Sequence, residues 1–328
     1  MGAGSWGTAL GVLLARKGHV VTLWSHDPDV ARGITAERRT PYLPDVVVPE
    51  TVHVSTDPEH AVAGAALVVS VSPSQFVRDV MTRAAPAISE DATLVSASKG
   101  IELGTLRRMD EVLTEILPAP LMDRFTVLSG PSFAGEVARE MPTAVVVAGR
   151  SEEAAVTVQH AFQTPYFRVY TNTDVVGVEL GGAVKNVIAL AAGVAAGLGF
   201  GHNTSAALMT RGLAEITRLG LAMGARRETF SGLAGMGDLV LTCTGSLSRN
   251  RTVGYRLGRG ERLEDILQDM SSVAEGVRTS EAVFALARRH GVEMPITEEV
   301  YAIVHDGRDP AAALSALMHR DPKPEDWS

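Results

Sequence analysis

The 328-residue chain has the length of about two average domains, and its 45% hydrophobic and 21% charged residues are typical of a globular protein. Its 30 basic and 38 acidic side chains give a formal net charge of −8, which argues against a general nucleic-acid binder, because such proteins carry a basic surface. The single cysteine, Cys243, excludes an intramolecular disulfide framework and a cysteine-cluster metal site, and we expect no metal.

The longest purely apolar run spans residues 187–200. Its 14 residues are fewer than the about 18 that suggest a membrane span, so we interpret it as a buried helix. The start of the chain lacks the basic region followed by an apolar region that marks a signal peptide. We therefore expect a cytoplasmic protein without a membrane span.

In the first half of the chain, short β-branched runs alternate with helical patterns. This alternation predicts an α/β domain with a doubly wound, parallel sheet and right-handed crossovers. Three prolines, Pro41, Pro44 and Pro49, predict a loop or a short hairpin after the first of these strands. We expect strands at residues 19–24, 66–71, 93–97, 126–129 and 144–148, and helices at 8–16, 75–84 and 107–116.

The second half shows few strand signals and predicts an all-α domain. We place the boundary between residues 1–172 and 173–328, where no linker rich in proline or serine occurs, so the two domains should pack directly. Helices are expected at residues 176–198, 205–223, 278–290, 298–305 and 311–319.

A glycine-rich loop opens the chain. Residues 2–7 read Gly-Ala-Gly-Ser-Trp-Gly and match the pattern G-x-G-x-x-G. In this pattern Gly2 permits a tight turn, Gly4 lets the backbone approach a pyrophosphate, and Gly7 lets the next helix pack closely. A helical pattern follows at once, and the next strand lies at the distance that a βαβ unit needs. We interpret the loop as a dinucleotide site, although such glycines also mark ordinary turns.

The strand that should precede this loop is absent, because Met1 alone stands before Gly2. That strand is central in a doubly wound sheet, and without it two neighbouring strands lose a partner. Each unpaired buried backbone group costs about 1–3 kcal/mol. We therefore expect the biological start to lie upstream, with a true but atypical start as the alternative.

The residues after the first predicted strand bear on the choice of nucleotide. NAD enzymes commonly place an acidic residue there to bind the ribose hydroxyls, whereas this chain has Ser25 and His26. Because no carboxylate stands at that place, a 2′-phosphate would not be repelled there, and His26 and Arg32 would attract it. This favours NADP over NAD. The alternative is that Asp27 and Pro28 simply cap the next helix.

Two of the four lysines stand in apolar surroundings, in a chain that uses arginine for its other 26 basic groups. Lys99 follows a predicted strand at the edge where α/β sheets bind ligands. Lys185 lies in a helical stretch, with Gly181 and Gly182 four and three residues before it. Glycines in mid-helix cost about 1 kcal/mol each, which suggests that something approaches closely there. A lysine suits acid–base chemistry, and the alternative is a side chain that extends from a packed helix into solvent.

Two further segments offer groups for an ammonium or a phosphate. Asp238 follows a glycine turn and precedes an apolar segment, so it either caps a helix or neutralises a buried ammonium. Ser248, Arg249 and Asn250 place a hydroxyl, a guanidinium and an amide together, and an arginine fork matches phosphate geometry. A solvated turn is the alternative for this segment.

Together these motifs resemble the bacterial NAD(P)-dependent glycerol-3-phosphate dehydrogenases over nearly the whole chain. The glycine loop would fit many dehydrogenases, but the helix around Lys185 and the Ser-Arg-Asn segment are more specific. The matching segments, in family order, are residues 2–9, 23–28, 98–100, 129–134, 179–187, 237–244, 248–250, 275–276 and 294–299.

The resemblance implies an N-terminal Rossmann domain, a helical C-terminal domain and an active site in the cleft. It implies the interconversion of sn-glycerol 3-phosphate and dihydroxyacetone phosphate with NAD or NADP, which supplies glycerol 3-phosphate for phospholipid synthesis. The cofactor carries the hydride, and Lys185 would accept the proton, with Asp238 beside it.

The resemblance also assigns residues to ligands. The nucleotide would contact Gly2, Gly4, Ser5, Trp6, Gly7, His26, Lys99, Ala134, Arg249, Val273 and Glu275. The small phosphorylated substrate would contact Lys99, Gly130, Ser132, Lys185, Asp238, Ser248, Arg249 and Asn250. No nucleic acid is an expected partner, and the oligomeric state stays open, a homodimer included.

Two alternatives stay open at this point. A two-domain reductase of similar build that acts on a hydroxy acid would turn over a carboxylate substrate but not dihydroxyacetone phosphate. A nucleotide-sensing protein would bind without turnover. The helix around Lys185 and the Ser-Arg-Asn segment argue against the sensor, because a sensor needs no proton relay.

Overall fold

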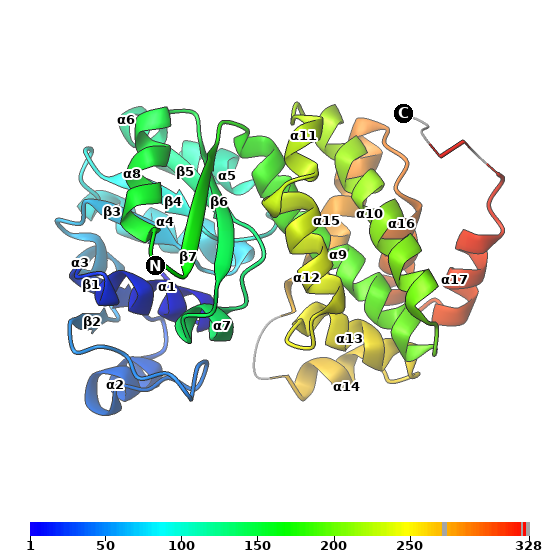
Figure 1. The fold of residues 1–328 in the computed structure, drawn as a ribbon, viewed down its shortest axis with the longest axis horizontal. Helices are drawn as coiled ribbons and strands as arrows, with labels where there is room; N and C mark the ends of the chain where they lie inside the picture. The colour runs from blue at the N-terminus through cyan, green and yellow to red at the C-terminus, as the bar shows by residue number, and fades with distance from the viewer. Residues whose placement is uncertain (271–273, 323, 326–328) are drawn as a thin grey trace. The chain divides into compact units, whose positions relative to one another are not determined.

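The computed structural model describes residues 1–270, 274–322 and 324–325 of the chain. Its contacts divide the chain into two compact units (Figure 1). The first unit comprises Met1–Lys99 and Arg107–Val178, and the second comprises Gly100–Leu106 and Glu179–Ser328. The division falls inside the long helix α9 (Val175–Gly197), shortly after the boundary that the sequence predicts.

Among the described residues, the first unit contains seven short strands in two sheets. β1 pairs with β2, and β3 to β7 form a second sheet in sequence order. All neighbouring strands run parallel except β5 and β6. The strands are β1 (Val21–Trp24), β2 (Val52–Ser55), β3 (Leu67–Ser70), β4 (Thr93–Ser96), β5 (Phe125–Ser129), β6 (Thr143–Gly149) and β7 (Phe167–Asn172).

The five strands expected from the sequence are confirmed, but the fully parallel sheet is wrong at β6, which runs antiparallel to β5. The connection between these strands contains the five-residue helix α7 (Ala134–Ala138), which is too short to carry the chain back along the length of the sheet. The sequence interpretation also missed β2 and β7. The Phe-Arg-Val-Tyr run in β7 alternates apolar and polar residues, so that strand had a visible signal.

Met1 lies where a central strand would join the two sheets. Its ammonium donates to the carbonyl of Val69 at 2.7 Å, and its carbonyl accepts from the amide of Val71 at 2.9 Å. On the other side, the amide of Gly2 donates to the carbonyl of Trp24 at 3.2 Å. The glycine loop is therefore held at the position between β1 and β3 without a strand of its own in the described residues.

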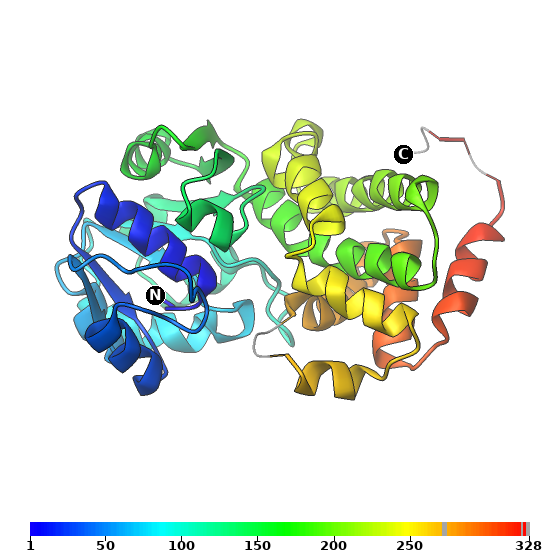
Figure 2. The same cartoon turned by 60° about the horizontal axis from the view of Figure 1, so that its bottom comes forward.

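Helix α1 (Ser5–Arg16) is central to the first unit because its two faces enter two apolar clusters. Leu10 and Leu13 pack with residues of the five-stranded sheet, whereas Val12 packs with β1 and β2. The helix also contacts α7 and α8 (Figure 2). The remaining elements of this unit are α2 (Pro28–Glu37), α3 (Pro58–Val62), η1 (Ser74–Phe76), α4 (Val77–Ala84), η2 (Ala85–Ala87), α5 (Met109–Ile116), α6 (Ala119–Asp123) and α8 (Glu152–Phe162).

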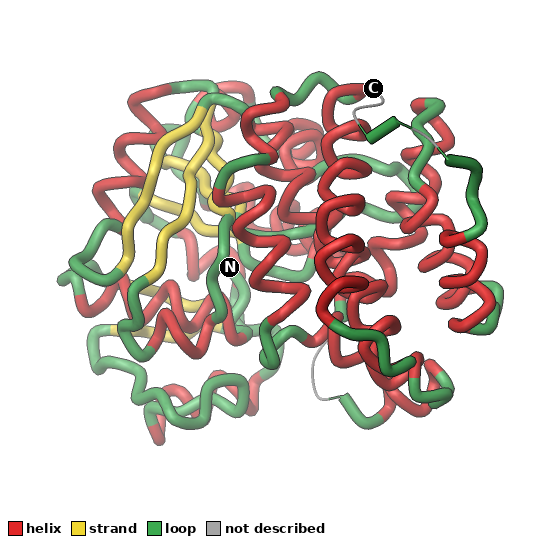
Figure 3. Tube along the Cα trace, turned by 45° about the vertical axis from the view of Figure 1, so that its right-hand side comes forward, coloured by secondary structure: helices red, strands yellow, loops and turns green. Residues whose placement is uncertain are grey.

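The described part of the second unit is helical (Figure 3), which confirms the predicted all-α half. Helix α9 is long and apolar enough to cross a membrane, but 94% of the apolar window is buried within the fold, as in a core helix. The other elements are α10 (His202–Ala222), α11 (Arg227–Phe230), η3 (Leu233–Gly237), α12 (Asp238–Thr244), α13 (Arg249–Gly258), α14 (Leu263–Gln268), α15 (Glu275–His290), α16 (Pro295–His305) and α17 (Pro310–Met318).

The backbones of α9 and α13 approach each other very closely. A Cβ at Gly193 or Gly254 would lie 2.1 Å from a backbone carbonyl oxygen of the other helix. A Cβ at Gly197 or Gly258 would lie 2.2 or 2.3 Å from another such oxygen. Any larger residue at these four positions would force the two helices apart.

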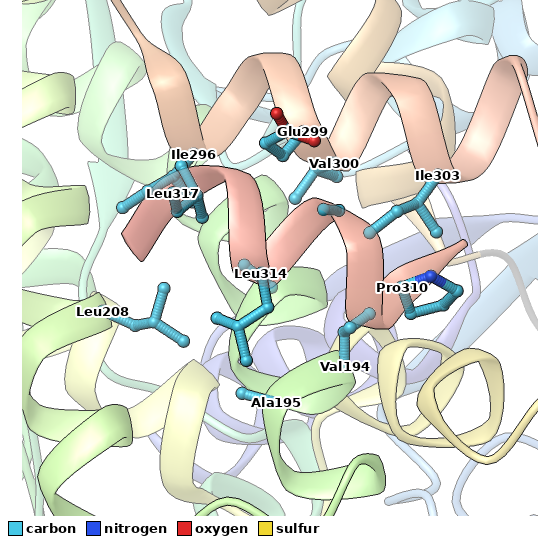
Figure 4. A pocket seen from close by; sticks show the side chains of 12 residues that line it. Val194, Ala195, Leu208, Ile296, Glu299, Val300, Ile303, Pro310, Leu314 and Leu317 are labelled. Carbon is cyan, nitrogen blue, oxygen red and sulfur yellow. The ribbon is translucent and has the colours of Figure 1, made fainter. Parts of the chain in front are cut away.

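Helix α17 covers an apolar face of the second unit (Figure 4). The cavity beneath it measures ≈ 20 Å³ and is lined by side chains that include Leu208, Val300 and Leu314. This volume holds about one water molecule, whereas ligand pockets measure roughly 300–1,000 Å³. We interpret it as a packing gap.

Glu215 places a carboxylate inside the second unit. It is 1% exposed and accepts hydrogen bonds from the amide of Ile296 at 2.7 Å and from the amide and hydroxyl of Thr297 at 3.2 and 3.1 Å. Glu215 therefore caps the first turn of α16 from a neighbouring helix. Burial raises the pKa of Glu215 to about 7, and the bonds from Ile296 and Thr297 offset part of that rise.

We predict that Glu215 makes stability depend on pH. A carboxyl group whose pKa is higher in the folded than in the unfolded chain stabilises the fold below the unfolded pKa and loses that contribution as the pH rises. Between about pH 5 and pH 7, the free energy of unfolding of the wild type should fall by roughly 2 kcal/mol more than that of Glu215→Gln. Urea denaturation of both proteins across this range measures the difference, and parallel pH profiles would contradict it.

Candidate active site

The glycine loop adopts the tight turn that its sequence predicts. Gly2 has a φ of 122°, and a Cβ at Gly7 would lie 1.8 Å from the carbonyl oxygen of Gly2. Gly7 therefore cannot be enlarged without moving the loop. Helix α1 begins at Ser5, so the amides of its first turn lack carbonyl partners within the helix.

The loop also offers the open space and the donors that a pyrophosphate requires. The position of a Cβ on Gly4 has no atom within 4 Å beyond its immediate neighbours. The indole Nε1 of Trp6 is buried and has no hydrogen-bond partner within the described part of the chain. Free amides and the dipole at a helix N-terminus favour anionic groups. These residues therefore fit a dinucleotide.

The segment after β1 carries the groups expected near the adenine ribose. Ser25 is buried and its hydroxyl donates to the carbonyl of Asp27 at 3.0 Å, whereas His26 is exposed. The carboxylate of Asp27 accepts from the amide of Asp29 at 2.8 Å and so caps α2, as its alternative interpretation predicts. The guanidinium of Arg32 forms an exposed ion pair with Asp29.

Three residues predicted to bind substrate come together in the first unit. Lys99 follows β4 and Gly130 follows β5, which are neighbouring parallel strands. The ammonium of Lys99 donates to the carbonyl of Gly130 at 3.3 Å, and the hydroxyl of Ser132 donates to the same oxygen at 3.0 Å. Ala134, a predicted nucleotide contact, begins α7 just beyond them. This is the strand edge where α/β sheets bind ligands.

A buried ion pair lies in the second unit. The ammonium of Lys185 on α9 contacts the carboxylate of Asp238, the first residue of α12, and these residues are 6% and 1% exposed. The two residues are 53 positions apart in the sequence. The structure thus confirms the interpretation of Asp238 as the partner of a buried ammonium.

Thr242 completes this group and was not singled out from the sequence. Its hydroxyl donates to the backbone carbonyl of Asp238 at 2.6 Å, and its oxygen accepts from the ammonium of Lys185 at 2.9 Å. The signal was its position four residues after Asp238, which places both side chains on one face of a helix. Burial raises the pKa of the neighbouring Cys243 thiol to about 12, so the reactive thiolate is disfavoured at neutral pH.

An amide network ties α9 to the N-termini of two other helices. The amide nitrogen of Asn250 donates to the side-chain oxygen of Asn186 at 2.9 Å, and its oxygen accepts from the backbone amide of Gly276 at 2.9 Å. Asn186 was also missed, although it directly follows Lys185. Asn250, which was predicted to bind substrate, therefore also holds α13 and α15 against α9.

The first residues of α13 and α15 include other predicted ligand contacts. Ser248 caps α13 by accepting from the amide of Arg251 at 3.3 Å. Arg249 is exposed at the start of that helix, and Glu275 is half-buried at the start of α15. Val273, a predicted nucleotide contact, lies outside the described residues.

The predicted residues thus form two groups, one in each unit, and their meeting in one cleft stays a prediction. A depression of ≈ 380 Å³ on the first unit lies elsewhere. Its lining does not include a predicted site residue; it consists of Thr114, Leu117, Ala119, Met122, Asp123, Arg150 and Ser151.

A glycine loop at a helix N-terminus, joined to a helical unit with a buried lysine–carboxylate pair, defines a two-domain nucleotide-dependent dehydrogenase. Comparison with known proteins makes this specific. Residues 1–155 match the N-terminal part of the family described as NAD-dependent glycerol-3-phosphate dehydrogenase, and residues 174–315 match its C-terminal part. The chain belongs to this family, which confirms the resemblance drawn from its motifs.

Individual relatives match this chain over almost its full length and over almost the full length of their own chains. The glycerol-3-phosphate dehydrogenase [NAD(P)+] of Geobacter metallireducens is 58% identical over 99% of this chain and 97% of its own. That of Geobacter sulfurreducens is 57% identical over 100% of this chain and 98% of its own. The crystal structure of glycerol-3-phosphate dehydrogenase from Coxiella burnetii superposes with a TM-score of 0.93 at 41% identity, covering 97% of each chain.

We predict that Thr242→Val destabilises the protein through Lys185. The loss of the oxygen leaves a buried ammonium hydrogen without its acceptor, which costs about 1–3 kcal/mol. Thr244→Val is a matched control, because Thr244 also donates to the carbonyl four residues before it, at 2.8 Å, but is exposed. Urea denaturation should show the larger loss for Thr242→Val, and equal losses would mean that the bond to Lys185 contributes nothing.

Proposed function

We propose that this chain interconverts sn-glycerol 3-phosphate and dihydroxyacetone phosphate with a nicotinamide nucleotide. The buried contact between Lys185 and Asp238, completed by Thr242, is the observation that carries this proposal. Oxidation of a secondary alcohol requires one group that takes the hydroxyl proton, and a buried lysine held by a carboxylate provides such a group. The names of the relatives support the choice of substrate.

The nucleotide would be held by the glycine loop and the first turn of α1, with Gly2, Gly4, Ser5, Trp6 and Gly7 at the phosphates. When bound, the nicotinamide accepts hydride from the substrate or donates hydride to it. Lys99, Ala134, Arg249, Val273 and Glu275 are proposed as further contacts. In this proposal residues 1–172 form the nucleotide-binding domain, and residues 173–328 form the catalytic domain.

Lys185 would move the proton at the C2 oxygen of the substrate. In the oxidising direction its neutral amine accepts the hydroxyl proton, and in the reducing direction its ammonium donates that proton and stabilises the developing alkoxide. Asp238 holds the ammonium through its charge, and Thr242 fixes its direction. Because both partners are almost fully buried, water competes little for the ammonium.

The substrate phosphate would bind at the start of α13. Arg249 is exposed there, on a ten-residue helix whose N-terminal dipole favours an anion. An arginine fork donates two parallel hydrogen bonds to a phosphate. Ser248 and Asn250 would stand beside it, and Lys99, Gly130 and Ser132 would complete the substrate contacts from the first unit.

We propose NADP as the preferred nucleotide. Ser25 and His26 carry no negative charge at the end of β1, and the carboxylate of Asp27 is engaged in capping α2. A 2′-phosphate near His26 would meet no repulsion from these residues. Arg32 would have to exchange its ion pair with Asp29 for the phosphate. The ratio of the dissociation constants for NADPH and NADH decides the preference.

In the cell we propose that the enzyme acts in the cytoplasm and supplies glycerol 3-phosphate for phospholipid synthesis. The family assignment and the burial of α9 support this proposal. A homodimer is compatible with it and is tested by the mass of the protein in solution.

Lys185→Met tests the proposed reaction directly. Methionine keeps the bulk of the side chain but cannot transfer a proton, so turnover of dihydroxyacetone phosphate with NADPH should fall about 100-fold or more. Nucleotide affinity should stay near that of the wild type, because Lys185 is not among the proposed nucleotide contacts. The assignment of Lys185 is wrong if the variant keeps more than about a tenth of the wild-type rate.

Arg249→Ala tests recognition of the phosphate. Loss of one charged hydrogen bond costs about 1.5–3 kcal/mol, which corresponds to roughly a tenfold to hundredfold drop in kcat/KM. The drop should be much smaller for unphosphorylated dihydroxyacetone at saturating NADPH.

Arg249→Lys is the matched control for the Arg249→Ala experiment. It keeps the charge but loses the planar fork, so an intermediate value is expected. If Arg249→Ala lowers kcat/KM for dihydroxyacetone and for its phosphate by the same factor, the side chain does not bind the phosphate.

A further inference from the structure

The turn before Asp238 is wider than an ordinary helical turn. In η3, the amide of Gly237 donates to the carbonyl of Gly232 at 3.1 Å, and the amide of Asp238 donates to the carbonyl of Leu233. Both bonds span five residues, the pattern of a π-helix. Such single turns are rare and occur often at functional sites. Here the wide turn ends at Asp238.

The face of α9 that carries Lys185 also receives this turn. Gly181 lies four residues before Lys185, so the two positions share one side of the helix. A Cβ at Gly181 would lie 2.5 Å from the carbonyl oxygen of Ala234, inside η3. Any side chain at position 181 would therefore push the turn away from α9.

The opposite side of the turn is held just as closely. A Cβ at Gly235 would lie 2.1 Å from the carbonyl oxygen of Phe230, and the ring of Phe230 fills the space above Gly220 on α10. Phe230 is 1% exposed. Phe230 thus supports the turn on the side away from α9, and the turn can move outward only if Phe230 moves with it.

We propose that Gly181 is a positioning residue, which sets the separation of Lys185 and Asp238 by letting the η3 backbone rest directly on α9. This inference rests on the proposed role of Lys185 as the proton acceptor. Gly181 itself contacts neither substrate nor nucleotide in this proposal. It acts through the turn that delivers Asp238.

A change in this separation alters the electrostatic hold on the Lys185 proton. With an alanine at position 181, the turn moves outward and the carboxylate of Asp238 recedes. The ammonium is then less stabilised, so Lys185 releases its proton at a lower pH. An increase of about 1 Å in a partly screened pair corresponds to a shift of roughly one pH unit.

The experiment measures the pH dependence of sn-glycerol 3-phosphate oxidation in Gly181→Ala. The rate of oxidation rises with pH as Lys185 loses its proton, and we expect the midpoint of this rise to move to lower pH by roughly 0.5–1 unit. The dissociation constant for NADPH should stay unchanged. A loss of activity without a shift of the midpoint would overturn the proposal, because a purely structural defect lowers the rate at every pH alike.

Gly197→Ala is the matched control. It is the same substitution on the same helix, and its Cβ would lie 2.2 Å from the carbonyl oxygen of Tyr255, an atom of the same kind as in the η3 contact. It should lower the melting temperature by a similar amount and leave the midpoint of the pH profile unchanged. A shift in the control equal to that of Gly181→Ala would also overturn the proposal.

Phe230→Leu provides a second variant that adds no atoms, in case Gly181→Ala does not fold. The smaller side chain leaves space between residue 230 and Gly220 on α10, so the backbone of residue 230 and the η3 turn that packs on it can recede, and the midpoint should again move to lower pH. Lys185→Met distinguishes a failure of the proposed function from a failure of the positioning role of Gly181. If Lys185→Met keeps its turnover, the proposed function fails. If Lys185→Met is inactive while Gly181→Ala and Phe230→Leu keep the wild-type midpoint, the positioning role alone fails.

Discussion

The second unit depends on how closely other backbones approach α9. At Gly181 the wide turn before Asp238 rests on the helix, and at Gly193 the backbone of α13 does so. Lys185 lies between these two contacts. Glycines within a helix cost about 1 kcal/mol each, so this close packing offsets a real penalty. This packing places the carboxylate of Asp238 beside Lys185 and the start of α13 beside Asn186.

A buried ion pair needs a reason beyond stability. Removing two charges from water costs several kcal/mol, and a buried pair often stabilises a protein no better than apolar residues of similar size. The pair of Lys185 and Asp238 is nevertheless supported by the hydroxyl of Thr242 and by the wide turn before Asp238. These contacts around one ammonium are better explained if Lys185 transfers a proton than if the pair is a purely structural ion pair.

Local signals in the sequence predicted the glycine loop, the helix of Lys185 and the carboxylate of Asp238, because each has an unusual composition. The two glycines before Lys185 indicated a close approach, but their spacing could not identify the carbonyl oxygen of Ala234 as the atom that approaches. Thr242 was missed because isolated threonines are common and its partner lies 57 residues away. The direction of β6 was also inaccessible, since an apolar run has the same pattern whichever way the strand runs.

The amide of Asn250 shows how the remaining parts are held. Its two ends bind Asn186 on α9 and Gly276 at the start of α15, so one side chain joins three helices. Displacing any of the three would leave a buried polar group unsatisfied, at about 1–3 kcal/mol. Catalysis by electrostatic stabilisation requires groups that are already in place before the charge develops. The network on α9 holds its groups in place through backbone contacts and shared hydrogen bonds, and this arrangement fits the proposed role of Lys185.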